Sequence, residues 1–124
     1  MIPRVIVTGA AGLIGQYLVR TAARWAPQWE VQALTRADLD LTDLPAMTAV
    51  FQKLKPNLVI HAAALSRTKD CEQDPHLARR VNVDATAHLA RVCQDIPFLF
   101  LSSGEVFDGR RGWYQEDDHP APIN

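Results

Sequence analysis

Short, uniformly apolar runs alternate along the chain with longer stretches in which apolar residues recur every three or four positions. A short apolar run rich in β-branched or aromatic side chains predicts a buried strand. Spacing of three and four predicts an amphipathic helix. The four predicted strands are residues 4–8, 30–35, 58–61 and 98–101. The three predicted helices are residues 12–25, 43–55 and 74–92.

Residues that favour helix ends support these boundaries. Asp43 is a predicted N-cap with Pro45 in the first turn, and Asp74 is another, followed directly by Pro75. Pro27 ends the first helix, because proline disfavours a helical conformation in the residue before it. Beyond the fourth strand, a glycine- and arginine-containing stretch and an acidic, proline-containing tail predict loop.

The order of these elements indicates the fold class. Strand and helix in alternation, with short connections and apolar strands, are typical of a parallel sheet covered by helices on both faces. We therefore predict an α/β fold, a Rossmann-like doubly wound parallel sheet of four strands, in one domain over residues 1–124. Right-handed crossovers favour the strand order 3-2-1-4.

The composition narrows the classes of partner. Of 124 residues, 48% are hydrophobic and 22% charged, and the formal net charge is −1. These values are ordinary for a globular protein and give no electrostatic reason to expect nucleic acid or an anionic membrane. We expect no membrane span and no leader, because no apolar run is long enough. Cys71 and Cys93 lack zinc-site spacing, so we expect no metal, buried or incidental thiols, and a cytoplasmic location.

A glycine-rich segment, Thr8 to Gly15, lies between the first strand and the first helix. Gly9 allows the tight exit from the strand, Gly12 lets a pyrophosphate approach the backbone, and Gly15 lets the helix pack closely on the sheet. Free amide groups at the helix N-terminus favour phosphate. The segment therefore predicts a dinucleotide site, and a glycine turn that serves packing alone is the alternative.

The end of the second strand indicates which nicotinamide cofactor binds. A carboxylate near this place binds the ribose 2′-hydroxyl of NAD, whereas an arginine accommodates the 2′-phosphate of NADP. The strand ends Leu34-Thr35-Arg36, without an acid. We therefore favour NADP(H) over NAD(H), and a surface arginine without a ligand is the alternative for Arg36.

The spacing GxxGxxG resembles that of the short-chain dehydrogenase/reductase superfamily, and later segments strengthen the resemblance. Asp40-Leu41 resembles the pair whose carboxylate meets the adenine amino group, with Asp38 and Asp43 as alternatives. His61-Ala62-Ala63-Ala64 resembles the turn against which the cofactor ribose lies, and Asn82 matches the asparagine that supports the active site. The implied cofactor-binding residues are Gly9, Ala11, Gly12, Leu13, Ile14, Gly15, Arg36, Asp40, Leu41, Ala62, Ala63, Ala64 and Asn82.

Enzymes of that superfamily use a Ser or Thr and a Tyr-x-x-x-Lys pair, whose tyrosine exchanges a proton with the substrate oxygen. Ser103, after the fourth strand, matches the Ser or Thr. Neither tyrosine matches, because Thr21 lies four residues after Tyr17 and Asp118 four after Tyr114. We therefore expect a truncated, amino-terminal part of an extended family member, without its substrate-binding half and inactive alone. Its uncovered fourth strand predicts self-association or a homodimer.

The segment Val106-Phe107-Asp108-Gly109, followed by the Tyr-x-Glu-x-Asp that begins at Tyr114, most resembles dTDP-4-dehydrorhamnose reductases. These enzymes reduce the 4-keto group of a nucleotide sugar, which is the substrate that the resemblance implies. Ser103-Gly104-Glu105 departs from the Thr-Asp-Tyr or Ser-Asp-Tyr of those reductases. Two alternatives stay open. One is a nucleotide-sugar epimerase or dehydratase, and the other a non-catalytic subunit like the regulatory β subunit of methionine adenosyltransferase, which shares the Val-Phe-Asp-Gly and proline-rich segments.

Overall fold

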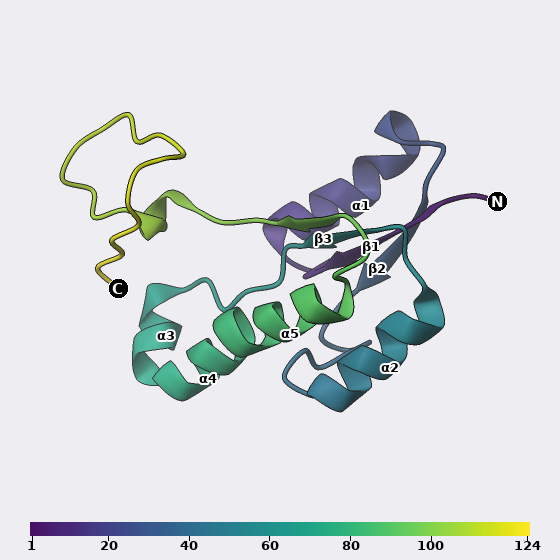
Figure 1. Cartoon of the computed structure of the whole chain (residues 1–124), viewed down its shortest axis with the longest axis horizontal. Helices are drawn as coiled ribbons and strands as arrows, with labels where there is room; N and C mark the ends of the chain where they lie inside the picture. The colour runs from purple at the N-terminus through teal and green to yellow at the C-terminus, as the bar shows by residue number, and fades with distance from the viewer.

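The computed structural model describes all 124 residues and contains every predicted strand (Figure 1). The strands are β1 (Arg4–Thr8), β2 (Glu30–Leu34), β3 (Leu58–His61) and β4 (Phe98–Phe100). The first two predicted helices form as α1 (Leu13–Trp25) and α2 (Leu44–Leu54). The structure therefore confirms the alternation of strand and helix that the hydrophobic pattern predicts.

The region after β3 contains more helical segments than the sequence predicts. The third helix begins as α4 (Pro75–Arg79), widens into the π-helical segment η1 (Arg80–Asp84) and continues as α5 (Ala85–Val92). A short helix before it, α3 (Thr68–Gln73), was not predicted. A single 3-10 turn, η2 (Gly104–Val106), follows β4, and the remaining residues form loop.

Both predicted N-caps are confirmed. The Asp43 carboxylate accepts a hydrogen bond from the Ala46 amide at 3.0 Å, and the Asp74 carboxylate accepts one from the Leu77 amide at 2.9 Å. Each bond satisfies an amide group that has no partner within its own helix. These local bonds explain why α2 and α4 begin where the sequence predicts.

The four strands form one parallel sheet in the order β2-β1-β3-β4. The fold class is confirmed, but the predicted strand order 3-2-1-4 is wrong. β3 pairs directly with β1, so that Ile6 at the centre of β1 lies between Gln32 of β2 and Val59 of β3. β1 and β3 are therefore the two central strands, and β2 and β4 are the edges.

The position of α2 explains the error. In Figure 1, α1 lies above the sheet, whereas α2 and α5 lie together below it. With right-handed crossovers, a change of face between successive helices reverses the direction in which strands are added. The chain therefore steps from β1 out to β2, returns beneath the sheet and adds β3 on the far side of β1. The order 3-2-1-4 requires α1 and α2 on the same face.

The hydrophobic core fills the layer between the sheet and the α2 and α5 helices. Ile6 and Val59 contribute from the sheet, Met47 and Phe51 from α2, and Leu89 from α5, all of them buried. The opposite face is more open, since Gly15 is the only buried residue of α1. The α2 face thus carries most of the apolar burial that stabilises the domain.

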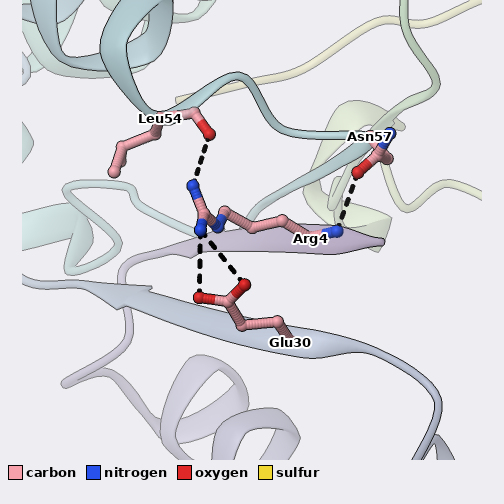
Figure 2. Close-up of polar contacts among 4 residues, drawn as sticks. All are labelled: Arg4, Glu30, Leu54 and Asn57. Carbon is pink, nitrogen blue, oxygen red and sulfur yellow. Dashed lines mark hydrogen bonds and ion pairs between the residues drawn. The ribbon is translucent and has the colours of Figure 1, made fainter. Parts of the chain in front are cut away.

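Arg4 ties several elements together at the amino edge of the sheet (Figure 2). One guanidinium nitrogen donates to both carboxylate oxygens of Glu30 at 3.1 Å, and another donates to the carbonyl oxygen of Leu54 at 2.7 Å. Its backbone amide donates to the Asn57 side chain at 2.8 Å. A cation at the last carbonyls of α2 also complements the helix dipole. Arg4 therefore joins β1, β2 and the end of α2 at the edge of the sheet that is remote from the glycine turn (residues 8–15).

Both cysteines are free thiols, and Cys93 is buried as expected. Cys93 lies in the core, where burial raises the pKa of its thiol to about 11. Cys71 is partly buried and donates to the Leu65 carbonyl, with 3.2 Å between the sulfur and the oxygen. None of the helices has the length and apolarity that a bilayer crossing requires.

Candidate functional site

A cavity of about 400 Å³ opens at the carboxyl edge of the sheet, where parallel α/β folds bind ligands. It is lined by Gly9, Ala11, Gly12, Thr35, Arg36, Asp40, Leu41, Thr42, Ala62, Ala63, Ala64, Leu65 and Val81. Nine of the residues expected from the sequence to bind a cofactor are among them. Leu13, Ile14, Gly15 and Asn82 are not in the lining, although Leu13 and Asn82 each directly follow a lining residue in the chain.

The glycine turn is tight at two points. Gly9 has φ +66°, and a Cβ on it would come within 2.6 Å of the Ala63 nitrogen and 2.7 Å of the Ala62 carbonyl. A Cβ on Gly15 would lie 2.1 Å from the Gly9 carbonyl oxygen. Glycine is therefore required at both positions, by the left-handed conformation and by close backbone approach. Gly12 differs, because a Cβ there would meet only the Gly9 carbonyl oxygen, at 3.2 Å, and it lines the cavity.

The N-terminus of α1 is open toward an anion. Gly12 is its N-cap and supplies no side-chain hydrogen bond, and no acidic residue lies in the first turn. The amides of Leu13 and Ile14 have no acceptor within the chain, and both residues are exposed. Free amide groups and the helix dipole together favour a phosphate at this end.

Three aspartates follow β2, and the structure distinguishes them. Asp38 accepts hydrogen bonds from the amide and the hydroxyl of Thr35, at 2.8 and 2.7 Å, and Asp43 caps α2. Only Asp40 lines the cavity. One of its oxygens accepts from the Thr42 amide at 2.9 Å and the Thr42 hydroxyl at 2.8 Å, and these bonds hold the pKa of the Asp40 carboxyl below its usual value. Asp40 therefore presents an ionised carboxylate to the cavity.

Arg36 is the only cationic side chain in the lining. It is exposed and takes part in no ion pair or side-chain hydrogen bond within the chain. Its guanidinium is thus available for an external anion, which it would bind with a planar array of donors.

The backbone after β3, Ala62 to Ala64 (the alanine turn), is positioned by His61, which is 1% exposed. Hydrogen bonds join its Nδ1 to the Thr8 hydroxyl at 2.7 Å and its Nε2 to the Thr86 hydroxyl at 3.0 Å. The Thr8 hydroxyl also accepts from the Ala63 amide at 3.4 Å. Burial lowers the pKa of His61 from 6.5 to about 4, so the imidazole is neutral at physiological pH. No local pattern indicates these partners, because Thr8 and Thr86 lie 53 and 25 positions from His61 in the chain.

Asn82 acts on the same turn from the side of the π-helical segment. Its side-chain oxygen accepts from the Leu65 amide at 2.8 Å, and its side-chain nitrogen donates to the Leu65 carbonyl at 3.0 Å. Leu65 lines the cavity, whereas Asn82 does not. Asn82 thus supports the cavity wall by fixing the backbone, rather than by forming its surface.

Ser103 lies outside the cavity, on the connection after β4. It is exposed, and its hydroxyl accepts from the Glu105 amide at 3.3 Å as the N-cap of η2. The loop beyond it has structure of its own, since the rings of Phe107 and Tyr114 stack with centroids 4.3 Å apart. The Tyr114 hydroxyl donates to Asp108 at 2.6 Å. Tyr114 therefore has a structural role in this loop.

Known proteins resemble the chain over nearly its whole length. It is 39% identical to the dTDP-4-keto-6-deoxy-D-glucose reductase of Streptomyces niveus, over 100% of this chain and 43% of that protein. It is 35% identical to methionine adenosyltransferase 2 subunit beta of Xenopus laevis, over 98% of this chain and 38% of that protein. The chain thus spans about two-fifths of the length of these curated relatives.

A solved structure resembles the chain in fold as well as in sequence. The dTDP-4-dehydrorhamnose reductase from Bacillus anthracis, in complex with NADP, superimposes with a TM-score of 0.91 at 30% identity. The match covers 100% of this chain and 45% of that one. A family model described as RmlD substrate binding domain matches residues 3–124. The chain therefore belongs to the RmlD family, which fits the glycine turn, the parallel sheet and the cavity described above.

Proposed function

We propose that the chain is the NADP(H)-binding part of a longer reductase that acts on a nucleotide sugar and reduces its 4-keto group. The observation that carries this is the lining of the cavity, which joins the glycine turn, Arg36, Asp40 and the alanine turn at the carboxyl edge of the sheet. The NADP complex of the Bacillus anthracis reductase and the Streptomyces niveus reductase support it.

Each end of the cavity suits one part of the cofactor. The pyrophosphate would lie at Gly12 and the free amides of Leu13 and Ile14, where a Cβ is missing and the helix dipole is favourable. Arg36 would bind the 2′-phosphate, and the Asp40 carboxylate would accept from the adenine amino group. The bound cofactor supplies the hydride. Ser103 would orient the substrate oxygen, and the proton donor would come from a Tyr-x-x-x-Lys pair that these 124 residues do not contain.

The cofactor assignment is tested by isothermal titration of the chain with NADPH and NADH. We expect tighter binding of NADPH, and we expect Arg36→Ala to remove that preference while NADH binding stays unchanged. Arg20→Ala, which removes an exposed arginine on α1, is the matched control. Equal affinities for the two cofactors, or a preference that survives Arg36→Ala, would mean that the arginine is only a surface charge.

The reaction is tested on the full-length protein. We expect it to oxidise NADPH when supplied with a dTDP-4-keto-6-deoxy sugar, and to form the corresponding 4-hydroxy sugar. If a Tyr-x-x-x-Lys pair is present and no 4-keto nucleotide sugar is reduced, the reductase assignment fails. Formation of an epimerised or dehydrated sugar without net oxidation of NADPH would favour the epimerase or dehydratase alternative.

A non-catalytic binding subunit is the second candidate. It is favoured by the 35% identity to methionine adenosyltransferase 2 subunit beta, which is close to the identity with the reductases. The two candidates share the cofactor cavity and differ in the proton donor. A full-length protein that binds NADP(H), lacks the tyrosine or the lysine, and has no reductase activity would support the binding subunit.

We also propose a location and an association state for the protein. We assign it to the cytoplasm, because a reducing compartment suits the free thiols of Cys71 and Cys93. We also expect self-association or a homodimer, because β4 is an edge strand and its Leu99 and Phe100 are exposed. Fractionation and light scattering of the native protein test these two expectations.

A further inference from the structure

We propose that Thr86 is a positioning residue for the nicotinamide cofactor, which acts through His61 to fix the separation of two backbone turns that line the cavity. These are the glycine turn and the alanine turn. Thr86 itself lies on α5 and is not in the cavity lining. We rest this inference on the proposed function, because it needs NADP(H) in the cavity.

The glycine turn and the alanine turn are in direct backbone contact. A Cβ on Gly9 would come within 2.6 Å of the Ala63 nitrogen and 2.7 Å of the Ala62 carbonyl group. All three residues line the cavity. A site that binds one ligand across both turns needs their separation held to about 0.5 Å, so the groups that hold the two backbones together affect its affinity.

A continuous series of hydrogen bonds runs from the alanine turn to α5. The Ala63 amide donates to the Thr8 hydroxyl at 3.4 Å. The Thr8 hydroxyl is bonded to Nδ1 of His61 at 2.7 Å, and Nε2 of His61 is bonded to the Thr86 hydroxyl at 3.0 Å. Thr8 begins the glycine turn and His61 directly precedes the alanine turn, and each is 1% exposed. The series therefore joins both turns to the helix through buried groups.

The hydrogen-bond donors in this series follow one direction. The Thr8 hydroxyl oxygen accepts from the Ala63 amide, so its hydrogen is available to Nδ1 of His61. Burial lowers the pKa of His61 to about 4, and a neutral imidazole has one N–H group and one acceptor nitrogen. The hydrogen is therefore on Nε2, which donates to the Thr86 hydroxyl. Thr86 is the only acceptor that this buried N–H group has within the chain.

The same helical segment holds the other end of the alanine turn. Asn82, four residues before Thr86, is bonded to both the amide and the carbonyl of Leu65. His61 and Leu65 flank the alanine turn on its two sides. The turn is thus held at both ends from one helix, directly by Asn82 and through His61 by Thr86.

Removal of the Thr86 hydroxyl should weaken NADPH and NADH alike. Valine has the shape of threonine but cannot accept the Nε2 hydrogen, which leaves a buried N–H group without a partner. The imidazole must then change its position or its bonds, and Thr8 transmits either change to Ala63. The two cofactors differ only in the 2′-phosphate, which we place at Arg36. The preference for NADPH should therefore survive a change at Thr86, although Arg36→Ala should remove it.

The experiment measures the NADPH and NADH affinities of Thr86→Val and Thr86→Ser by isothermal titration of the chain. We expect Thr86→Val to weaken both by about fivefold to tenfold, and Thr86→Ser, which keeps the hydroxyl, to stay within about twofold of the unaltered chain. Thr48→Val is the matched control, because Thr48 is bonded to Nε2 of His88 at 2.8 Å and neither residue lines the cavity. It should lower the melting temperature and leave both affinities unchanged.

Nitrogen NMR of the imidazole rings provides a second measurement, which needs no variant at Thr86. The chain has four histidines, so the ring signals of His61 are assigned by their loss in His61→Asn. We expect Nε2 of His61 to carry the hydrogen at neutral pH and Nδ1 to be the bare nitrogen. Circular dichroism establishes that each variant in the titrations is folded.

Four results would overturn the inference. Thr86→Val with unchanged affinities, Thr86→Ser as weak as Thr86→Val, or Thr48→Val as weak as Thr86→Val would each show that the Thr86 hydroxyl does not position the cofactor. A hydrogen on Nδ1 of His61 would show that Thr86 does not accept from it. In these cases the proposed function stands if the unaltered chain prefers NADPH. If the unaltered chain binds neither cofactor, the proposed function fails and the inference fails with it.

Discussion

Asn82 holds the backbone of Leu65 at both of its polar groups, accepting from its amide at 2.8 Å and donating to its carbonyl at 3.0 Å. One side chain thus replaces the partners that a strand or helix would provide for that residue. The turn after β3 can therefore leave regular structure and still form a fixed wall of the cavity.

Replacing Asn82 by alanine should loosen this wall. The substitution leaves the part-buried amide of Leu65 without a partner, and it leaves the carbonyl of Leu65 with only the weak hydrogen bond from the Cys71 thiol. This costs about 1–3 kcal/mol of unfolding free energy. The affinity for NADP(H) should fall too, since Ala62 to Leu65 line the cavity. Urea unfolding and cofactor titration measure the two effects. Asn124→Ala, which removes one exposed bond to Glu105, is the control, and equal effects of the two substitutions would contradict the role of Asn82.

Gly15→Ala should be among the most disruptive single-methyl changes in the chain. The new Cβ would lie 2.1 Å from the Gly9 carbonyl oxygen and 2.7 Å from its carbon, which are backbone atoms of a tight turn. We expect a loss of at least about 2 kcal/mol of stability, together with loss of cofactor binding. Thermal unfolding checks this against Gly104→Ala, whose Cβ meets nothing within 4 Å. A Gly15→Ala protein as stable as Gly104→Ala would mean that the turn and α1 can move apart.

Buried His61 should make the fold sensitive to mild acid. Its pKa is about 4 in the folded chain and 6.5 as its ordinary value, so the unfolded chain takes up the proton first as the pH falls. The stabilisation is complete above about pH 6.5 and is lost progressively down to about pH 4, to a total of about 3 kcal/mol. Urea unfolding at several pH values measures the slope. His61→Asn should remove most of it, whereas the same change at exposed His119 should leave it intact.

The edge strand β4 should make the isolated chain self-associate. It pairs only with β3, and Leu99 and Phe100 are each 52% exposed. Light scattering over a range of concentrations should show species larger than a monomer, and Leu99→Lys should reduce them because an edge lysine opposes strand addition. Ile2→Lys, at an exposed apolar residue before β1, should have no such effect. A monomer at all concentrations would show that β4 does not template association.

The 124-residue chain by itself should bind NADP(H) and reduce no keto-sugar. It contains no tyrosine with a lysine four residues later, so the general-acid contribution of about a hundredfold to ten-thousandfold is missing. NADPH oxidation with a dTDP-4-keto-6-deoxy sugar measures this, with the full-length protein as the comparison. Turnover by the 124-residue chain at an ordinary enzymatic rate would require a different proton donor, and Tyr114 would then be the first to test.

The elements and the glycine turn could be predicted because their causes are local. Asp43 and Asp74 cap helices whose first amides lie three residues away, and Gly9 and Gly15 serve one strand-to-helix turn. Apolar runs of strand length and apolar spacing of helix period act in the same way. These features depend on residues close together in the chain, so the sequence by itself determined the fold class and most of the residues that line the cavity.

Contacts between distant residues were decided only by the tertiary structure. Strand order follows from which face of the sheet α2 covers, and that depends on its packing with α5 rather than on any local pattern. The bonds of His61 to Thr8 and of Asn82 to Leu65 join residues 53 and 17 positions apart. Asp40 is a further example. The sequence does not distinguish it from Asp38 and Asp43, and only the folded loop shows that Asp40 faces the cavity. Such choices rest on packing and on the satisfaction of buried polar groups, which exist only once the elements have come together.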